Sequence, residues 1–136
     1  MKPETAPFLA KARQFPAKAE SMLAAGWPDE AGRAAYLAAF QAAQALIFER
    51  RDDVPRRHAG VHAVFDTVLR AEPRFDVTLR PFLRRAYVLK TRADYDTEPG
   101  MPVTSATATE ALTEARRFVA AVAALIEPDG DHPSGA

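Results

Sequence analysis

Apolar residues recur every three to four positions over most of the chain, which is the spacing of one face of an α-helix. This pattern predicts five helices, over about 7–25, 28–50, 58–71, 77–95 and 105–126. No segment shows the apolar–polar alternation that is typical of a half-buried strand. Five helices with short connections predict an all-α protein, an up-and-down bundle of four to five helices.

The segment 28–50 differs from the other four because it is apolar nearly all round, and its centre reads RAAYLAAFQAAQALIF. A helix that lacks a polar face is typical of the interior of a bundle. Several alanines would let neighbouring helices approach it closely: Ala34, Ala35, Ala38, Ala39, Ala42 and Ala43. Pro28 suits the first turn of such a helix. We therefore predict that this segment is the central helix.

Local signals refine the remaining helices. Pro16 lies inside the first one, where a proline removes a hydrogen bond and clashes with the preceding turn, so we expect a kink or a break there. At the start of the last helix, Thr107 and Glu110 have the spacing of a capping box, while Thr104 is a competing N-cap. Residues 128–136 have the composition of a disordered tail, which leaves 1–127 as a single domain.

The composition is that of an ordinary globular domain. A length of 136 residues points to one domain, and 48% hydrophobic with 26% charged residues is normal for that class. The absence of cysteine excludes disulfides and cysteine-based zinc sites. No apolar run has the length of a membrane span, and the first residues lack the apolar core of a signal peptide. We expect a cytoplasmic protein with no membrane association and no cofactor.

The net charge is zero, but the charges are unevenly spread along the chain. Between 49 and 92, eleven Lys and Arg residues stand against six Asp and Glu, whereas between 93 and 136 two stand against eight. The middle third could therefore form a basic face that suits a polyanion. Acidic residues from elsewhere could equally interleave with these cations once the chain is folded. The sequence leaves both possibilities open.

His58 and His62 stand four residues apart in the third predicted helix, and Asp66 follows one turn later. This spacing places the three side chains roughly on one face, as a metal site requires. The alternative is that His58 lies at the helix start as a polar cap and that His62 lines a contact between helices. We favour this second interpretation and assign no metal site.

The end of the fourth predicted helix carries a concentrated set of polar groups, in the stretch KTRADYD. Lys90 falls on or beside the apolar stripe, where an ammonium must extend to water or find an anion. Asp94 is its i+4 neighbour, and such a pair contributes at most ~0.5 kcal/mol. Arg92 and Asp96 have the same spacing, and Tyr95 suits a core position with its hydroxyl at the rim. The spacing alone fits a solvated helix end as well as a binding site.

Taken together, four stretches of the chain resemble small bacterial HEPN-domain proteins in their order and spacing. They are AAYLAAFQAAQALIFER at 34–50, RHAGVHAVF at 57–65, LKTRADY at 89–95 and ARRFV at 115–119. The resemblance covers roughly residues 7–127 and implies a HEPN bundle that forms a homodimer. It further implies a likeness to metal-independent ribonucleases, many of them toxins paired with a minimal nucleotidyltransferase antitoxin.

The resemblance also implies where a site would lie. In that family an arginine is followed, after four to six residues, by a histidine, and two copies of the motif face each other across a dimer groove. Here Lys90 stands in the place of the arginine and Tyr95 in the place of the histidine. A lysine cannot hold a phosphate in bidentate fashion, and a tyrosine with a pKa near ~10 is a weak base at neutral pH. His58 would supply an imidazole if its helix packs near the groove.

Two hypotheses follow from these observations. The first is a toxin-like protein that acts on RNA as a metal-independent endoribonuclease of a toxin–antitoxin pair. The second is a non-catalytic module that binds a nucleotide, RNA or a nucleotidyltransferase partner, with Tyr95 as an acceptor of nucleotidyl modification. Under the first hypothesis the catalytic residues are Lys90, Asp94, Tyr95 and His58, and those that bind RNA or phosphate are Arg92, Arg57 and His62.

Overall fold

The structure is a computed structural model of the chain, in which residues 1–95 and 102–127 are described, apart from the side chain of Tyr95. This part contains five α-helices and one short 3-10 helix: α1 (Thr5–Ala24), α2 (Pro28–Arg51), α3 (His58–Leu69), η1 (Val77–Leu79), α4 (Phe82–Tyr95) and α5 (Ser105–Ile126). No β-strand occurs in these residues. The predicted all-α class and the five predicted helices are confirmed.

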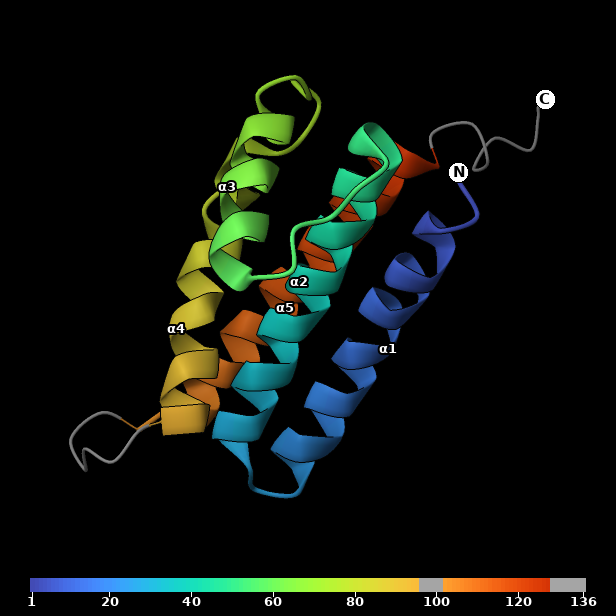
Figure 1. Cartoon of the computed structure of the whole chain (residues 1–136). Helices are drawn as coiled ribbons and strands as arrows, with labels where there is room; N and C mark the ends of the chain where they lie inside the picture. The colour runs from blue at the N-terminus through green and yellow to red at the C-terminus, as the bar shows by residue number, and fades with distance from the viewer. Residues whose placement is uncertain (96–101, 128–136) are drawn as a thin grey trace.

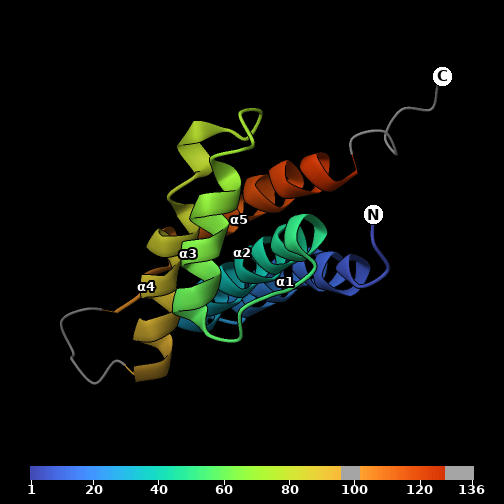
Figure 2. The same cartoon turned by 45° about the horizontal axis from the view of Figure 1, so that its top comes forward.

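The central element of the bundle is α2 (Figure 1). α1 runs antiparallel to α2 on one side, α3 and α4 lie on the other side, and α5 packs along α2 from behind. Figure 2 shows that α3 and α4 form a pair that crosses the direction of α1, α2 and α5. The segment 52–57 runs from the end of α2 back along its outer surface. α3 therefore begins beside the middle of α2.

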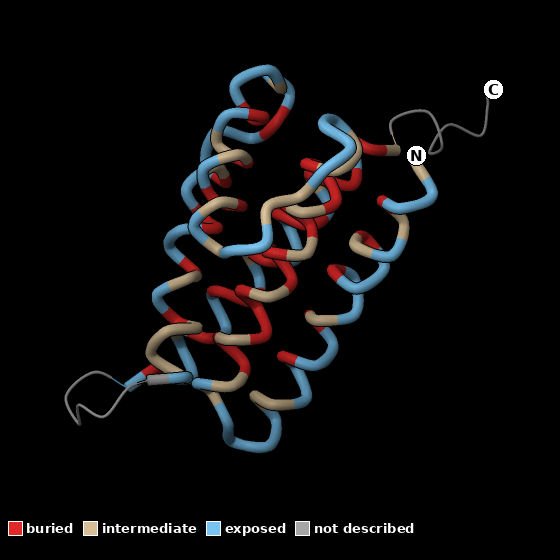
Figure 3. The backbone as a smooth tube through the Cα atoms, in the orientation of Figure 1, coloured by how far each residue is buried: buried red, intermediate tan, exposed pale blue. Residues whose placement is uncertain are grey.

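Almost every face of α2 is covered by other helices (Figure 3). Nine of its apolar residues are fully buried, with no exposed surface: Ala31, Ala35, Ala38, Ala39, Ala42, Ala43, Ala45, Leu46 and Ile47. Small side chains reduce the distance at which two helices pack, and α1 and α5 both make extensive contact with α2. The prediction that this segment is the central helix is confirmed.

A cluster of phenylalanines holds the upper part of α3 and the start of α4 against α5. The ring of Phe118 lies 5.5 Å from Phe65 and 5.7 Å from both Phe75 and Phe82, measured between ring centroids. Tilted and edge-to-face pairs at these separations contribute ~0.5–1.5 kcal/mol each beyond the burial of their area. The cluster therefore helps to fix the position from which α3 approaches α2.

Two predictions about proline and helix breaks need correction. Of the kink or break predicted at Pro16, the break is wrong, because α1 continues from Thr5 to Ala24 with this proline inside it. Pro16 is buried, so its packing offsets the lost hydrogen bond. The predicted fourth helix is divided, because a 3-10 turn (η1) precedes α4. Pro81 has no N–H with which to continue the helical hydrogen-bond pattern across this junction, and the Asp76 carboxylate accepts from the Thr78 N–H to cap the short turn.

The start of α5 resolves the choice between two caps. The hydroxyl oxygen of Thr104 accepts a hydrogen bond from the backbone N–H of Thr107 at 3.1 Å, which makes Thr104 the N-cap. The capping box expected from Thr107 and Glu110 is therefore not the cap of this helix.

The predicted tail, 128–136, and the segment 96–101 lie outside the described residues. Within 1–95 and 102–127, no helix combines the length and the apolar character needed to cross a membrane.

Candidate functional site

Polar side chains from two helices meet on one side of α2, around the hydroxyl of Tyr36. Its oxygen lies 2.6 Å from Nδ1 of His58 and 2.9 Å from Nε2 of His62. Tyr36 is fully buried, His62 is 4% exposed and His58 is half-buried. These three groups, called the hydroxyl bridge below, therefore lead from the interior of the protein to its surface.

The position of the two histidines follows from local sequence. Because they are four residues apart in α3, both lie on the helix face that packs against α2. His58 is the first residue of α3, after Arg57 in an extended conformation. No side chain caps this helix start, so its first N–H groups keep the partial positive charge of a helix N-terminus.

Aromatic rings hold the hydroxyl bridge in place. Phe40 stacks on the imidazole of His58, with 4.3 Å between the ring centroids. Tyr87 of α4 contacts both imidazoles, at 5.5 Å from His58 and 5.2 Å from His62. The two imidazoles are thus enclosed between α2 and α4, which restricts the rotation of their rings.

The surroundings keep all three groups of the bridge uncharged at neutral pH. Burial, with a smaller contribution from Tyr87, raises the pKa of the Tyr36 hydroxyl far above its usual value. Burial also lowers the pKa of His58; Lys90 lowers it further and Asp94 opposes this. The pKa of His62 is lowered to about 4, by burial first and then by the positive charge of Arg84 and by His58, against the opposing charge of Asp66.

An ion-pair network adjoins the bridge at the end of α4. The carboxylate of Asp94 lies 2.7 Å from Nζ of Lys90 and 3.0 Å from Nε of Arg33, which comes from α2. The hydrogen bond from Lys90 is the main cause that lowers the pKa of Asp94, so this carboxylate stays ionised. Two cations from different helices, Lys90 and Arg33, thus meet at the same carboxylate.

The sequence model of the HEPN domain family matches residues 6–125, which is nearly all of the chain. The chain belongs to the HEPN domain family. No curated protein matches it. The family assignment agrees with the resemblance found in the sequence and with the all-helical bundle.

This HEPN domain brings together some of the residues assigned from the sequence and separates others. Tyr36 joins His58 to His62, and Lys90 pairs with Asp94, both near enough to His58 to influence its pKa. Arg92 lies elsewhere: with Pro28, Asp29, Ala93, Pro102 and Val103 it lines a separate hollow of about 330 Å³.

Two further assigned residues stand outside the hydroxyl bridge and the ion-pair network. Arg57 is exposed just before α3 begins. The side chain of Tyr95, the last residue of α4, lies outside the described residues, so its assignment stays a prediction.

The metal ligands considered for His58, His62 and Asp66 do not converge in this HEPN domain. Both imidazoles direct a nitrogen at the Tyr36 hydroxyl, and Asp66 pairs with Arg84 at 2.6 Å. Among the residues that the structure describes, no group of three or more His, Cys, Asp or Glu side chains could hold a metal ion. The interpretation of His62 as a residue between helices agrees with its burial.

Three contributors to the site were not predicted from the sequence, namely Arg33, Tyr36 and Tyr87. Their partners are 61, 22 and 29 residues away along the chain for the pairs Arg33–Asp94, Tyr36–His58 and His58–Tyr87. One signal was present, because a buried tyrosine needs a partner for its hydroxyl. One turn away in the same helix, Ala39 and Phe40 have no polar group and Arg33 pairs with Asp94 instead.

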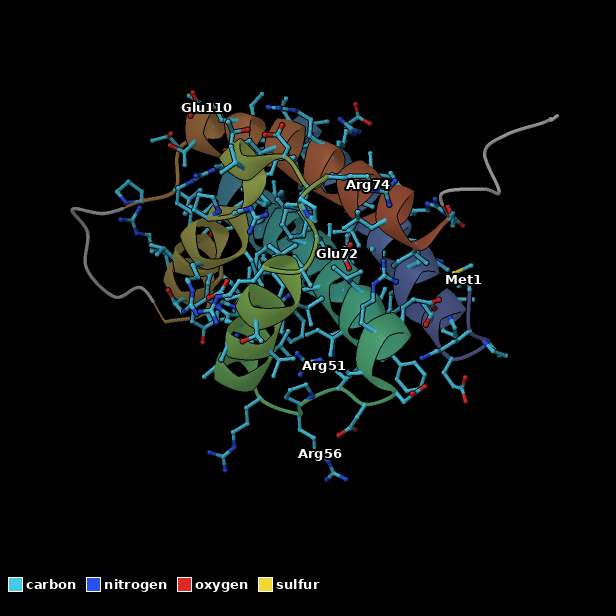
Figure 4. All side chains as sticks on the ribbon, turned by 90° about the horizontal axis from the view of Figure 1, so that it is seen from above. Met1, Arg51, Arg56, Glu72, Arg74 and Glu110 are labelled. Atoms are coloured by element: carbon cyan, nitrogen blue, oxygen red, sulfur yellow. The ribbon has the colours of Figure 1, made fainter. Side chains whose placement is uncertain are left out.

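Acidic residues interleave with the cations of the middle third. Arg50 pairs with Glu72, Arg84 with Asp66, Arg85 with Glu114 and Lys90 with Asp94. Seen from above, Arg51 and Arg56 lie near one edge of the molecule, while Arg74 lies at a distance from them with Glu72 between (Figure 4). Four of the eleven cations between 49 and 92 are thus each paired with a carboxylate.

Proposed function

We propose that this HEPN protein acts on RNA and cleaves its phosphodiester bonds without a metal ion, as a toxin-like protein of a toxin–antitoxin pair. The observation that carries the proposal is the juxtaposition of His58 with the Lys90–Asp94–Arg33 network. α3 thus supplies an imidazole next to the cation at the end of α4. The histidine that the family motif would place on α4 is absent there, and His58 is the proposed replacement.

The cations would hold the phosphate group. Lys90 is 15% exposed and Arg33 is 41% exposed at their side chains, so both are accessible from outside. Asp94 keeps the two side chains in fixed positions before any anion arrives. The uncapped start of α3 adds its partial positive charge to the same region. An anionic phosphodiester is the ligand that this combination favours.

The proposed reaction uses one imidazole twice. Nε2 of His58 accepts the proton of a ribose 2′-hydroxyl while the 2′-oxygen forms a bond to phosphorus. The bond from phosphorus to the 5′-oxygen then breaks, and the same proton is delivered to the departing 5′-oxygen. Lys90 and Arg33 stabilise the negative charge that develops on the phosphoryl oxygens. The products are a 2′,3′-cyclic phosphate and a 5′-hydroxyl.

Incubation of the purified protein with total cellular RNA, in the presence of EDTA, tests this proposal. We expect new 2′,3′-cyclic phosphate ends, formed about 10²–10⁴-fold more slowly by His58→Gln and about 10²–10³-fold more slowly by Lys90→Ala. Lys11→Ala, which removes an exposed lysine from the outer face of α1, is the matched control and should cleave normally. Equal activity in the wild type and both site variants would overturn the proposal.

The second candidate is a binding module without catalysis. It is favoured because Lys90 and Tyr95 stand where the family motif has an arginine and a histidine. Under this proposal the same site holds a nucleotide or RNA, and a minimal nucleotidyltransferase is the partner that modifies Tyr95. Salt-dependent RNA binding without cleavage would support it. Intact mass after co-expression with such a nucleotidyltransferase should rise by one nucleotidyl group, and Tyr95→Phe should abolish the rise. Sedimentation of the purified chain would test the proposed homodimer.

A further inference from the structure

The turn between α1 and α2 presents the single tryptophan of the chain to solvent. The side chain of Trp27 is 59% exposed. An indole stabilises a fold mainly through the apolar area that it buries, so more than half of that contribution is unused here. Exposed apolar area of this kind marks contacts with other molecules. The turn lies at the same end of the bundle as the end of α4 (Figure 1).

Hydrogen bonds on both sides hold the backbone of Trp27 in place. Its N–H donates to the carbonyl of Met22 at 2.8 Å, and the N–H of Gly26 donates to that of Leu23 at 3.1 Å. With the positive φ of Gly26, these bonds form a Schellman motif that ends α1. The carbonyl of Trp27 accepts a hydrogen bond from the N–H of Ala31 in the first turn of α2. The indole is therefore attached to a backbone that needs no rearrangement to bind a ligand.

The indole borders an open hollow of about 450 Å³ between the end of α1 and the start of α2. This volume lies in the range of roughly 300–1,000 Å³ that is usual for small-molecule sites. The hollow, called the Trp27 hollow below, is mostly apolar and is lined by Lys18, Ser21, Met22, Ala25, Trp27 and Glu30. A contact between Trp27 and Met22 is usual in a Schellman motif, but it leaves the indole largely uncovered. A flat apolar ring can stack on this indole.

Two groups of opposite charge stand at the Trp27 hollow. Lys18 of α1 is exposed, and its Nζ lies 4.9 Å from the centroid of the Phe15 ring. This cation–π contact holds the ammonium near the hollow while its N–H groups stay able to bind an anion. Glu30, in the first turn of α2, supplies a half-buried carboxylate. A ligand that suits all three groups combines a flat ring, an anion and N–H donors, and a nucleotide has this combination.

Among the bases, guanine suits the carboxylate of Glu30 best. Its N1–H and N2–H₂ groups are neighbours on the Watson–Crick edge, so both can donate to the two oxygens of one carboxylate. Adenine and cytosine offer one amino group beside a bare ring nitrogen, which a carboxylate repels. Uracil offers a single N–H between two carbonyl groups. The phosphate of the same nucleotide can pair with the ammonium of Lys18 as a point charge.

We propose that the Trp27 hollow is a base-binding site for a guanine of single-stranded RNA. The base stacks on Trp27, its Watson–Crick edge donates to Glu30, and its phosphate pairs with Lys18. RNA as the source of the guanine rests on the proposed function, whereas the binding of the guanine nucleotide does not. The site would give the protein a preference for certain RNA sequences, because a carboxylate discriminates between bases and a phosphate contact does not.

The Trp27 hollow adjoins the ion-pair network at the end of α4. Pro28 and Asp29, the two residues after Trp27, line the hollow that also contains Arg92. Arg33, which pairs with Asp94 in the network, follows Trp27 by six residues. This separation is ~9 Å along α2, at ~1.5 Å per residue. A short stretch of single-stranded RNA held by the network can therefore reach the indole.

The fluorescence of Trp27 tests the site in the free protein, because the chain has no other tryptophan. Stacking of guanine on an indole quenches its emission, so we expect saturable quenching by guanosine monophosphate (GMP). Uridine monophosphate (UMP) should bind about 5- to 100-fold more weakly, and inorganic phosphate should cause no quenching. Quenching that does not saturate, or that GMP and UMP cause equally, would overturn the inference. Emission that changes with protein concentration and not with GMP would overturn it in favour of a second copy of the chain in the hollow.

Variants separate the three contacts, with calorimetry to measure the affinity. Trp27→Ala should weaken the binding of GMP by about 10- to 100-fold. Val77→Ala, which removes an apolar side chain that is 70% exposed on another part of the molecule, is the matched control and should bind normally. Lys18→Ala should weaken the binding of GMP several-fold and leave that of guanosine unchanged. Glu30→Gln should abolish the preference for GMP over UMP. Equal affinity of the wild type and Trp27→Ala for GMP would contradict the inference.

Two short RNAs distinguish RNA from the free nucleotide as the source of the guanine. One contains a single guanosine among uridines, and the other contains uridines only. We expect the first to bind more tightly than GMP, because the cations at the end of α4 contact its phosphates. Equal binding of the two RNAs would overturn RNA as the source.

Cleavage gives a further readout of the same site. We expect the wild type to cut at a fixed position relative to guanosine, and Glu30→Gln to lose this preference while it still cleaves. Cut positions that are the same in both proteins would contradict a role of the Trp27 hollow in the choice of RNA sequence. If the wild type cleaves no RNA, the proposed function fails, while the quenching by GMP still decides whether the hollow binds guanine.

Discussion

Two buried regions of α2 differ in what holds them together. In the alanine core (Ala38, Ala39, Ala42, Ala43 and Ala45), every side chain is apolar and has no exposed surface. Around the hydroxyl bridge, less than one turn away, buried groups are polar and make directed hydrogen bonds. The packing of the first region depends on the volume of its side chains. The structure of the second region depends on which group donates in each hydrogen bond. We therefore expect stability to depend on side-chain volume in the first region and on pH in the second.

The largest effect that would separate the two regions is a dependence of stability on pH. The folded pKa of His62 is about 4, below the ordinary value of 6.5. The unfolded chain therefore takes up a proton first, and the free energy of unfolding falls as the pH decreases from about 6.5 towards 4. The loss should be on the order of 2–3 kcal/mol. Urea denaturation at pH 7, 5.5 and 4.5 measures it.

Comparison with His62→Leu isolates this contribution, since the acidic residues that titrate below pH 5 are common to both proteins. The unfolding free energy of the wild type minus that of the variant should therefore fall as the pH decreases. A difference that stays constant from pH 7 to 4.5 would show that His62 is not held neutral by its burial. The alanine core has no titratable group and should make no such contribution.

Enlarging a side chain in the alanine core should give the next largest effect. Ala39 has no exposed surface, so Ala39→Leu forces the neighbouring helices apart and should cost about 1–3 kcal/mol. Ala10→Leu, at an exposed position of α1, is the matched control and should change stability by less than ~0.5 kcal/mol. Chemical denaturation measures both. An Ala39→Leu protein as stable as its control would mean that the core is not closely packed.

The smallest effect is expected at Gly32, where α2 approaches α4. A methyl group there would lie 3.3 Å from Cβ of Leu89 and 3.4 Å from Cγ1 of Val103. Gly32→Ala should gain up to ~1 kcal/mol from helix propensity and lose a similar amount through these tight contacts. We expect a net change within ~0.5 kcal/mol. A clear stabilisation would show that α4 can move away from α2 at little cost.

The fold was largely predictable because its signals are local. The apolar spacing located five helices, and the bounds of α5 agree with the prediction at both ends. Two details were wrong, the break at Pro16 and the undivided fourth helix over 77–95, and both have one cause: the sequence does not show what surrounds a proline. Pro16 is buried inside a continuous helix, whereas Pro81 precedes the first residue of α4.

The candidate site was predictable only in part. Lys90 and Asp94 are neighbours on one helix, so their spacing indicated the ion pair that the structure contains. Arg33 and Tyr36 of α2 reach the site only because α2, α3 and α4 pack together. The spacing of residues within one helix does not reveal such contacts. The i+4 spacing of His58 and His62 fits metal ligands as well as a contact between helices. Their shared partner is a tyrosine 22 residues before His58.

The burial of Tyr36 has a consequence for how members of this family diverge. A phenylalanine at this position would fill the same volume, keep the ring contacts with Phe40 and Tyr87, and leave the bundle intact. It would lack one oxygen atom, and with it the link between the two histidines. Two chains with the same fold and the same residues at the end of α4 could thus differ in activity. Under the proposed function, Tyr36→Phe would change the site and leave the packing of the bundle as it is.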